Sequence, residues 1–335
     1  MKRLIPLIMM LVLVSCGPDE HHGRVEGRID GINDATILAF VNDSAYDVSG
    51  SIDSVTVKRG KFSYEREITH PVMLTLLYPN FSTTRLILAP GKTAKVSGDA
   101  SRLSELKIDG NDDNLLLTEF RLHRVGKPER DVQREAATFI RSHAKTQAAL
   151  VLFREYFADA AVIEHNPTAS LLSEIEKSQP KNPVVKDLAS HLCPILTTAP
   201  GQSLPAFTGR DLDGKSVSSA DYKNRPLFIV FCAQWDGTFY NIKHRANKLK
   251  SILDNDRMAF LFVSLDVDKE NLRRAINYDP LPGKILYDGK GFDSPLVRKL
   301  GMRYISGSLL VGRDGKIKAR DIPVDQWEEK IPTLL

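Results

Sequence analysis

The chain has 335 residues, which is enough for two or three domains. Its hydrophobic content of 42% and its charged content of 26% are typical of a globular protein. The formal net charge is only +4, and the basic residues are spread along the chain, which argues against a nucleic acid or another polyanion as the partner.

The first sixteen residues are organised like a bacterial export signal. Lys2 and Arg3 give a positive start, and the apolar run Leu4–Val14 is too short to span a membrane as a helix. The sequence L-V-S-C that ends at Cys16 resembles the lipobox of bacterial lipoproteins. This resemblance implies that Cys16 becomes a lipid-modified first residue; the alternative is an ordinary secretory signal in which the cysteine is incidental.

Residues 17–23 are typical of a short polar tether. Gly17 does not resemble an inner-membrane retention signal, so the resemblance to lipoproteins favours the outer membrane. Asp19-Glu20 either resembles an acidic surface-export tag or forms part of a solvated linker. The expected location is therefore the cell envelope, with the lipid holding the chain to the membrane and either the periplasmic or the surface face possible.

Between residues 24 and 111 the pattern predicts short β-strands. They are expected at Gly23–Asp30, Thr36–Val41, Ser54–Lys58, Lys61–Glu67, Val72–Tyr78, Arg85–Leu88 and Thr93–Gly98. Strands of this length and spacing predict an all-β sandwich or small barrel. The stretches Ile52–Ser54, Gly60–Phe62 and Ala89–Lys92 resemble the β-sandwich of unassigned function found in Bacteroidetes lipoproteins. No catalytic group stands out there, and a carbohydrate or peptide site is the alternative.

Residues 112–198 are predicted to be a helical connector. Helices are expected at Leu115–Val125, from a cap at Asp131 to Ala161, at Ala169–Lys177 and at Asn182–Leu192. The metal-like pairs are Glu164-His165 and His191-x-Cys193. Each is short of the three or four ligands that a zinc site uses, so no metal and no cofactor are expected.

Residues 199–335 have the pattern of an α/β domain. The apolar run Leu227–Phe231 predicts a buried strand, and a turn at Asp236–Thr238 leads from it into a helix. Further elements are expected at Ala259–Asp266, Asn271–Asn277, Leu309–Val311, Lys316–Arg320 and Gln326–Leu335. This order predicts a mixed sheet with helices on both faces. The whole chain is therefore expected to be multidomain: an all-β sandwich, an α-helical connector and an α/β domain.

The central strand and turn read F-C-A-Q-W-D-G-T-F and resemble the F-W-A-x-W-C-x-x-C of TlpA-like thiol–disulfide oxidoreductases. The resemblance implies a thioredoxin-like fold, with Asp236 and Phe239 at the positions of the two redox cysteines. It also places Ser306 at the position of the family's cis-proline. A cis bond before a residue other than proline costs about 2.5–4 kcal/mol, so a trans peptide is expected there. Asp236 is expected to cap the helix instead.

Two functions remain open. The first is a redox-inactive domain that binds an extended peptide, an envelope protein or a small ligand in a groove near Trp235, Phe239, Tyr240 and Tyr304, because such aromatics supply contact area and a polar group. The second is a divergent thiol–disulfide oxidoreductase of the TlpA-like family.

A divergent oxidoreductase would have to use Cys232, perhaps with Cys193. Cys232 lies in the predicted buried strand, where a thiol is usually a small hydrophobe. The sequence does not decide whether the two cysteines pair. A hydrolase that uses Asp236 and His244 is disfavoured, because eight residues separate them along a helix, which is far for a hydrogen bond.

Overall fold

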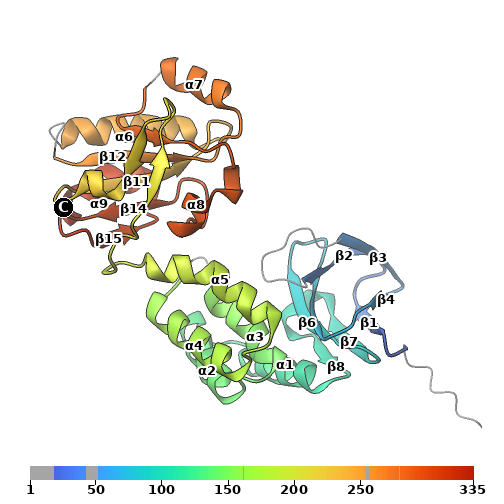
Figure 1. Cartoon of the computed structure of the whole chain (residues 1–335). Helices are drawn as coiled ribbons and strands as arrows, with labels where there is room; N and C mark the ends of the chain where they lie inside the picture. Colours follow the sequence, from blue (N-terminus) through green and yellow to red (C-terminus); the bar gives the residue numbers. More distant parts are fainter. Residues whose placement is uncertain (1–18, 43–51, 161, 254–256, 279) are drawn as a thin grey trace, which may run out of the picture. The chain divides into compact units, whose positions relative to one another are not determined.

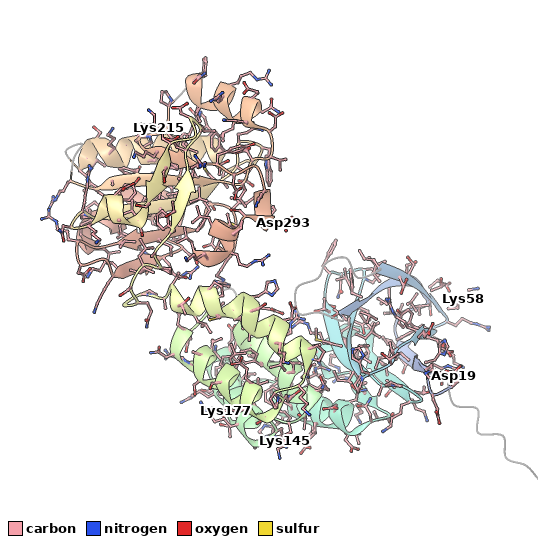
Figure 2. The ribbon with its side chains drawn as sticks, viewed as in Figure 1. Asp19, Lys58, Lys145, Lys177, Lys215 and Asp293 are labelled. Carbon is pink, nitrogen blue, oxygen red and sulfur yellow. The ribbon has the colours of Figure 1, made fainter. Side chains whose placement is uncertain are left out.

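The computed structural model describes residues 19–42, 52–160, 162–253, 257–278 and 280–335. The predictions for the export signal and Cys16 lie outside these residues. The chain divides into two compact units, Met1–Lys186 and Asp187–Leu335 (Figure 1). Exposed charged side chains of both signs, such as Lys58, Lys177 and Asp293, lie on the outside of the units (Figure 2).

The first unit begins with an eight-stranded sheet in the order β6-β5-β2-β3-β4-β1-β7-β8. Its strands are β1 His22–Asp30, β2 Asp34–Asn42, β3 Ile52–Lys58, β4 Lys61–Glu67, β5 Val72–Leu77, β6 Thr83–Leu88, β7 Thr93–Asp99 and β8 Lys107–Asp109. The pairing of β1 with β7 is parallel, and the other pairings are antiparallel. The sequence pattern predicted seven of these strands and missed the three-residue β8.

The sheet curls around one apolar core. The alternating pattern buries every second side chain, and residues from β1, such as Val25, share the core with residues from β6, such as Leu88. The strands approach so closely that a Cβ atom on Gly23 would lie 2.5 Å from Leu88 Cγ. A glycine is needed at this position because any side chain would push the curled sheet apart.

The helices of the first unit are α1 Asp112–His123, α2 Glu129–Ser142, α3 Gln147–Phe153, a π-helical segment Arg154–Ala158 and α4 His165–Ser178. Buried Asn114 fixes α1 to the sheet: its Oδ1 accepts from the Ile87 backbone N–H (2.8 Å) and its Nδ2 donates to the Ile87 carbonyl (2.9 Å). Helix α5, Pro183–Thr197, crosses the boundary between the units.

The prediction of one helical segment from Asp131 to Ala161 is wrong. Helix α2 ends with His143 in a non-helical conformation, and α3 begins anew because the Thr146 side chain accepts a hydrogen bond from the Ala149 N–H. The predicted cap is also misplaced, since Pro128 occupies the N-cap of α2 and Asp131 lies in its first turn.

The second unit holds a five-stranded mixed sheet in the order β13-β12-β11-β14-β15. The strands are β11 Leu227–Cys232, β12 Ala259–Ser264, β13 Lys284–Leu286, β14 Ser308–Val311 and β15 Ile317–Arg320, and a small hairpin of β9 Thr208–Arg210 and β10 Ser216–Ser218 precedes them. Strands β11, β12 and β13 are parallel, and β14 and β15 run antiparallel.

Both faces of this sheet are covered, as the sequence predicted. One face packs against α6 Phe239–Ile252, α7 Lys269–Tyr278 and α9 Trp327–Leu334. The other face packs against α8 Pro295–Lys299 and the β9–β10 hairpin. Strand β11 is buried along its whole length because its successive side chains alternate between the two apolar layers. None of the helices within the described ranges is long and apolar enough to span a membrane.

Candidate functional site

Three loops of the second unit converge at one end of its sheet. The parallel strands β11 and β12 both end there, so the segments that follow them lie side by side. The Leu265 N–H donates to the Cys232 carbonyl (2.9 Å), and the Gln234 N–H donates to both carboxylate oxygens of Asp266 (3.0 and 3.2 Å). The loop before antiparallel β14 joins them, because the Ser306 N–H donates to the Phe231 carbonyl (2.9 Å).

Ser306 has a distinctive backbone conformation. Its φ is +72°, in the left-handed region that residues with a side chain rarely adopt, and the peptide bond before it is trans. Its N–H is already bonded to the central strand, and the next residue, Gly307, is buried. Ser306 therefore shapes this loop against the end of β11.

Asp236 organises the turn between β11 and α6. Its Oδ1 accepts hydrogen bonds from the Thr238 N–H (2.9 Å) and from the Thr238 hydroxyl. The prediction that Asp236 is the helix cap is therefore corrected by two residues: Thr238 occupies the N-cap, and Asp236 forms a side-chain turn just before it.

Phe239 does not lie on the surface. It is the first residue of α6, only 5% of its surface is exposed, and it packs in the core layer that includes Ile242. The Lys243 Nζ lies 5.4 Å from its ring centroid. Because its ring faces inward, Phe239 supports the turn from beneath and is not available to a ligand above it.

Cys232, the thiol nearest to this turn, is fully buried at the end of β11. Burial raises the pKa of its thiol, and the nearby Asp266 carboxylate raises it further. A thiol reacts as its thiolate, so this environment opposes nucleophilic chemistry. Cys193 is exposed on α5, and both cysteines are free thiols rather than a disulfide.

Asp266 is a buried carboxyl group at the end of β12, with 1% of its surface exposed. Besides the Gln234 N–H, it accepts a hydrogen bond from the Ser264 hydroxyl (2.7 Å). No ion pair to Asp266 occurs among the described residues, and its burial raises the pKa of the carboxyl group.

Exposed aromatic side chains surround this end of the sheet. Trp235, Tyr240 and Tyr304 have 53%, 73% and 44% of their surfaces exposed. Sequence reasoning missed Val267 and Phe292, which are also exposed, and the Phe292 ring centroid lies 6.4 Å from that of Trp235. In a sequence, an exposed apolar residue in a loop between strands looks the same as a buried core residue. No sequence signal therefore identifies Val267 and Phe292 as exposed. We call these five residues the loop surface.

The structure brings no acid–base pair or metal site together from the other candidates. Within the described ranges, the Asp236 carboxylate bonds only to Thr238, and His244 is exposed on α6 without a bond to it. No cluster of three or more His, Cys, Asp or Glu side chains that could hold a metal ion occurs in the described part of the chain.

Two protein-family models match parts of the chain. Residues 24–117 match a domain of unknown function, DUF4369, and residues 199–335 match Redoxin. Among curated proteins, none is similar enough to count as a match. With its strand order and covered faces, the C-terminal region is thus a thioredoxin-like domain, which confirms the predicted fold class of a β-sheet domain, helices and an α/β thioredoxin-like domain.

Several solved structures similar to parts of the chain come from Bacteroides. A thiol-disulfide oxidoreductase from Bacteroides fragilis is 29% identical, with a TM-score of 0.37, and the match covers 40% of this chain and all (100%) of that one. The thioredoxin domain of a thiol-disulfide oxidoreductase from Bacteroides vulgatus is 23% identical, with a TM-score of 0.37 and coverages of 40% and 96%. A thioredoxin-like protein from Bacteroides caccae is 14% identical, with a TM-score of 0.48 and coverages of 62% and 78%.

Proposed function

We propose that this chain is a lipid-anchored protein of the cell envelope whose thioredoxin-like domain binds an extended peptide or a partner protein without redox chemistry. One observation carries the proposal. At the turn where the related oxidoreductases are expected to hold two thiols stand a hydrogen-bonded carboxylate, Asp236, and a buried ring, Phe239. The remaining nearby thiol, Cys232, is buried and has a raised pKa.

The loop surface is the favoured binding region because both edges of the sheet are already occupied nearby. The segment before β9 pairs with β15: the Gly201 N–H donates to the Ile317 carbonyl (2.7 Å), and the Ile317 N–H donates to the Gln202 carbonyl (2.8 Å). At the other edge, the Tyr287 N–H donates to the Arg210 carbonyl (3.0 Å). An incoming strand would therefore meet the exposed aromatics of the loop surface more readily than a free sheet edge.

The envelope location is supported by the lipobox-like sequence that ends at Cys16. A lipid on that residue would hold the chain at a membrane through its N-terminus, with outer-membrane sorting favoured by Gly17. Metabolic labelling with a radioactive fatty acid tests this: the wild-type chain should be labelled and Cys16→Ser should not. Equal labelling of both chains, or labelling of neither, would refute the anchor.

Reduction of insulin disulfides tests the redox part of the proposal. We expect no activity above the reductant-only background in the wild type or in Cys232→Ser. A double variant, Asp236→Cys with Phe239→Cys, restores two thiols at the turn and is the positive control. Wild-type activity that disappears in Cys232→Ser would instead support the alternative, a divergent oxidoreductase that uses Cys232.

Binding at the loop surface can be followed by fluorescence. The chain has two tryptophans, and Trp327 is completely buried, so a ligand on the loop surface should change mainly the emission of Trp235. With an alkylated, tryptophan-free insulin B chain as the extended probe, we expect a saturable change that Tyr240→Ala weakens. Tyr278→Ala, which removes another exposed tyrosine, is the matched control. Identical titrations for both variants and the wild type would place binding elsewhere.

A further inference from the structure

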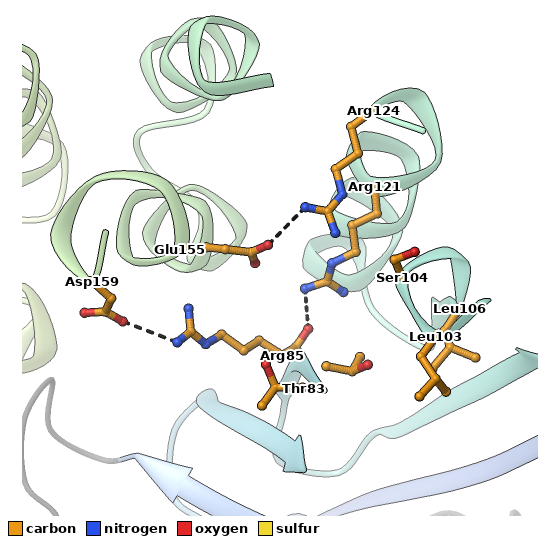
Figure 3. A pocket seen from close by; sticks show the side chains of 10 residues that line it. Thr83, Arg85, Leu103, Ser104, Leu106, Arg121, Arg124, Glu155 and Asp159 are labelled. Atoms are coloured by element: carbon orange, nitrogen blue, oxygen red, sulfur yellow. Dashed lines mark hydrogen bonds and ion pairs between the residues drawn. The ribbon is translucent and has the colours of Figure 1, made fainter. Parts of the chain in front are cut away.

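A polar cavity of about 260 Å³ lies within the first unit, where the sheet meets the helices (Figure 3). Its walls come from β6, from the 3₁₀ segment Ala100–Glu105, from α1 and from the π-helical segment. The side chains of Arg85, Arg121 and Arg124 reach toward it from two elements, and Glu155 and Asp159 face them from a third. None of these residues belongs to the loop surface.

The geometry of α1 explains why Arg121 lies in the wall of the cavity. Asn114, Leu117 and Arg121 follow one another at three and four residues, so they share one face of α1. That face is buried against the sheet, and the hydrogen bonds of Asn114 to Ile87 fix its position. Arg121 is thereby held with only 6% of its surface exposed.

The charges around the cavity do not balance. Arg124 pairs with Glu155 (3.3 Å), and Arg85 pairs with Asp159 (3.3 Å). Asp159 is also shared with Arg154 from outside the cavity (3.3 Å). Arg121 has no ion-pair partner among the described residues. The three arginines and two carboxylates that line the cavity leave a positive surplus.

Arg121 is also incompletely hydrogen-bonded. Its Nη2 donates to the Arg85 carbonyl (2.6 Å), whereas its Nη1 is buried without a partner in the described part of the chain. The hydroxyl of Thr84, another wall residue with 5% exposure, interacts instead with the buried hydroxyl of Tyr78. Leaving a buried polar group unbonded destabilises the fold, and more so when the group is charged. Donors of this kind are what an anion would satisfy.

We propose that this cavity binds the oxyanion group of a small molecule, a phosphate or a carboxylate, with Arg121 Nη1 as the donor. Arginine suits this role because its planar fork matches the geometry of both groups. The cavity corresponds to about nine water volumes at roughly 30 Å³ each, so it admits a small anion rather than a peptide. The site is independent of the function proposed for the thioredoxin-like domain.

Calorimetric titration of the full chain with inorganic phosphate and, separately, with acetate tests the proposal, with sodium chloride at equal ionic strength as the baseline. We expect saturable binding of at least one anion. Binding of phosphate alone identifies a phosphate ligand, and binding of acetate alone identifies a carboxylate. No saturable binding of either anion would overturn the proposal.

Variants locate the binding. Arg121→Gln should weaken the affinity at least tenfold, which corresponds to about 1.4 kcal/mol. Ser104→Trp should block the cavity from its exposed rim without touching Arg121 and keeps the test valid if Arg121→Gln does not fold. Arg134→Gln, which removes an exposed arginine of α2, is the matched control and should bind like the wild type. Equal affinity in all three variants would exclude this cavity as the site.

Discussion

Two buried arginines, one in each unit, differ in how completely their polar atoms are used. Arg320 on β15 pairs with Asp321 (2.9 Å) and donates to the Ile195 carbonyl (2.9 Å), the Thr198 hydroxyl (2.8 Å) and the Gly301 carbonyl (2.6 Å). Arg121 on α1 has one hydrogen bond and no counter-ion among the described residues. Both guanidinium groups have lost most of their contact with water.

The difference separates a structural role from a binding role. All three guanidinium nitrogens of Arg320 donate hydrogen bonds, to Asp321, to the end of α5 or to the Gly301 loop, so Arg320 joins these segments. Arg121 bears the cost of burial without full compensation, which a fold does not require for its own stability. An incompletely satisfied buried charge beside a cavity is therefore better evidence for a ligand than burial or charge alone.

The largest effect is expected at Arg320. Replacing Arg320 with methionine leaves Asp321 and several acceptors without their partner, so the second unit should lose about 3–5 kcal/mol in its free energy of unfolding. Urea unfolding followed by tryptophan fluorescence measures this unit alone, because both tryptophans lie in it. Arg313→Met on the exposed β14–β15 turn is the control. A loss below about 1 kcal/mol at Arg320 would remove the contrast between the two arginines.

A smaller effect is expected at Arg121. Arg121→Met deletes one hydrogen bond but also removes a poorly compensated buried charge, so the first unit should lose only about 1 kcal/mol. Far-UV circular dichroism reports on both units, so the first unit is followed by the part of that signal that does not coincide with the fluorescence transition of the second unit. The fluorescence transition itself should stay where it is in the wild type. A loss as large as that of Arg320→Met would mean that Arg121 is needed for the fold itself.

The sequence reveals the second unit better than the first because its signals are local. The run Leu227–Phe231 followed by the turn at Asp236 predicts a buried strand and a helix from neighbouring residues alone. The inward position of Phe239 was also encoded, since Phe239, Ile242, Ala246 and Leu249 recur at helical spacing and are all buried. The aromatic character of Phe239 suggested a surface contact, but the helical period decides its direction.

The cavity of the first unit could not be predicted in this way. Arg85, Arg121 and Glu155 are separated by more than thirty residues along the chain, as is clear from their numbers, and each resembles an ordinary solvated charge on its own. The break before Thr146 was missed for a related reason. A single threonine among apolar helix formers carries little signal until its side chain is seen to cap α3.

The smallest effect is expected at Asp266, a buried carboxyl group that is hydrogen-bonded like Arg320 but lacks a counter-ion among the described residues, like Arg121. Burial raises its pKa above the ordinary value of 3.8, so the folded chain holds this proton more tightly than the unfolded chain. The contribution of Asp266 to the free energy of unfolding is thus fully present at pH values below its ordinary pKa. It is lost as the pH rises through the raised pKa of the folded chain.

The pH dependence of urea unfolding tests whether Asp266 behaves like Arg121, as a buried charge without compensation, or like Arg320, as a buried charge compensated by its hydrogen bonds. If the missing counter-ion dominates, Asp266→Asn should flatten the decline in stability of the second unit as the pH rises through the raised pKa, because the amide does not titrate. Asp325→Asn, which removes an exposed carboxylate, should leave the decline unchanged. Parallel curves for the wild type and Asp266→Asn would mean that the hydrogen bonds from Gln234 and Ser264 compensate the buried charge completely, and Asp266 would then belong with Arg320.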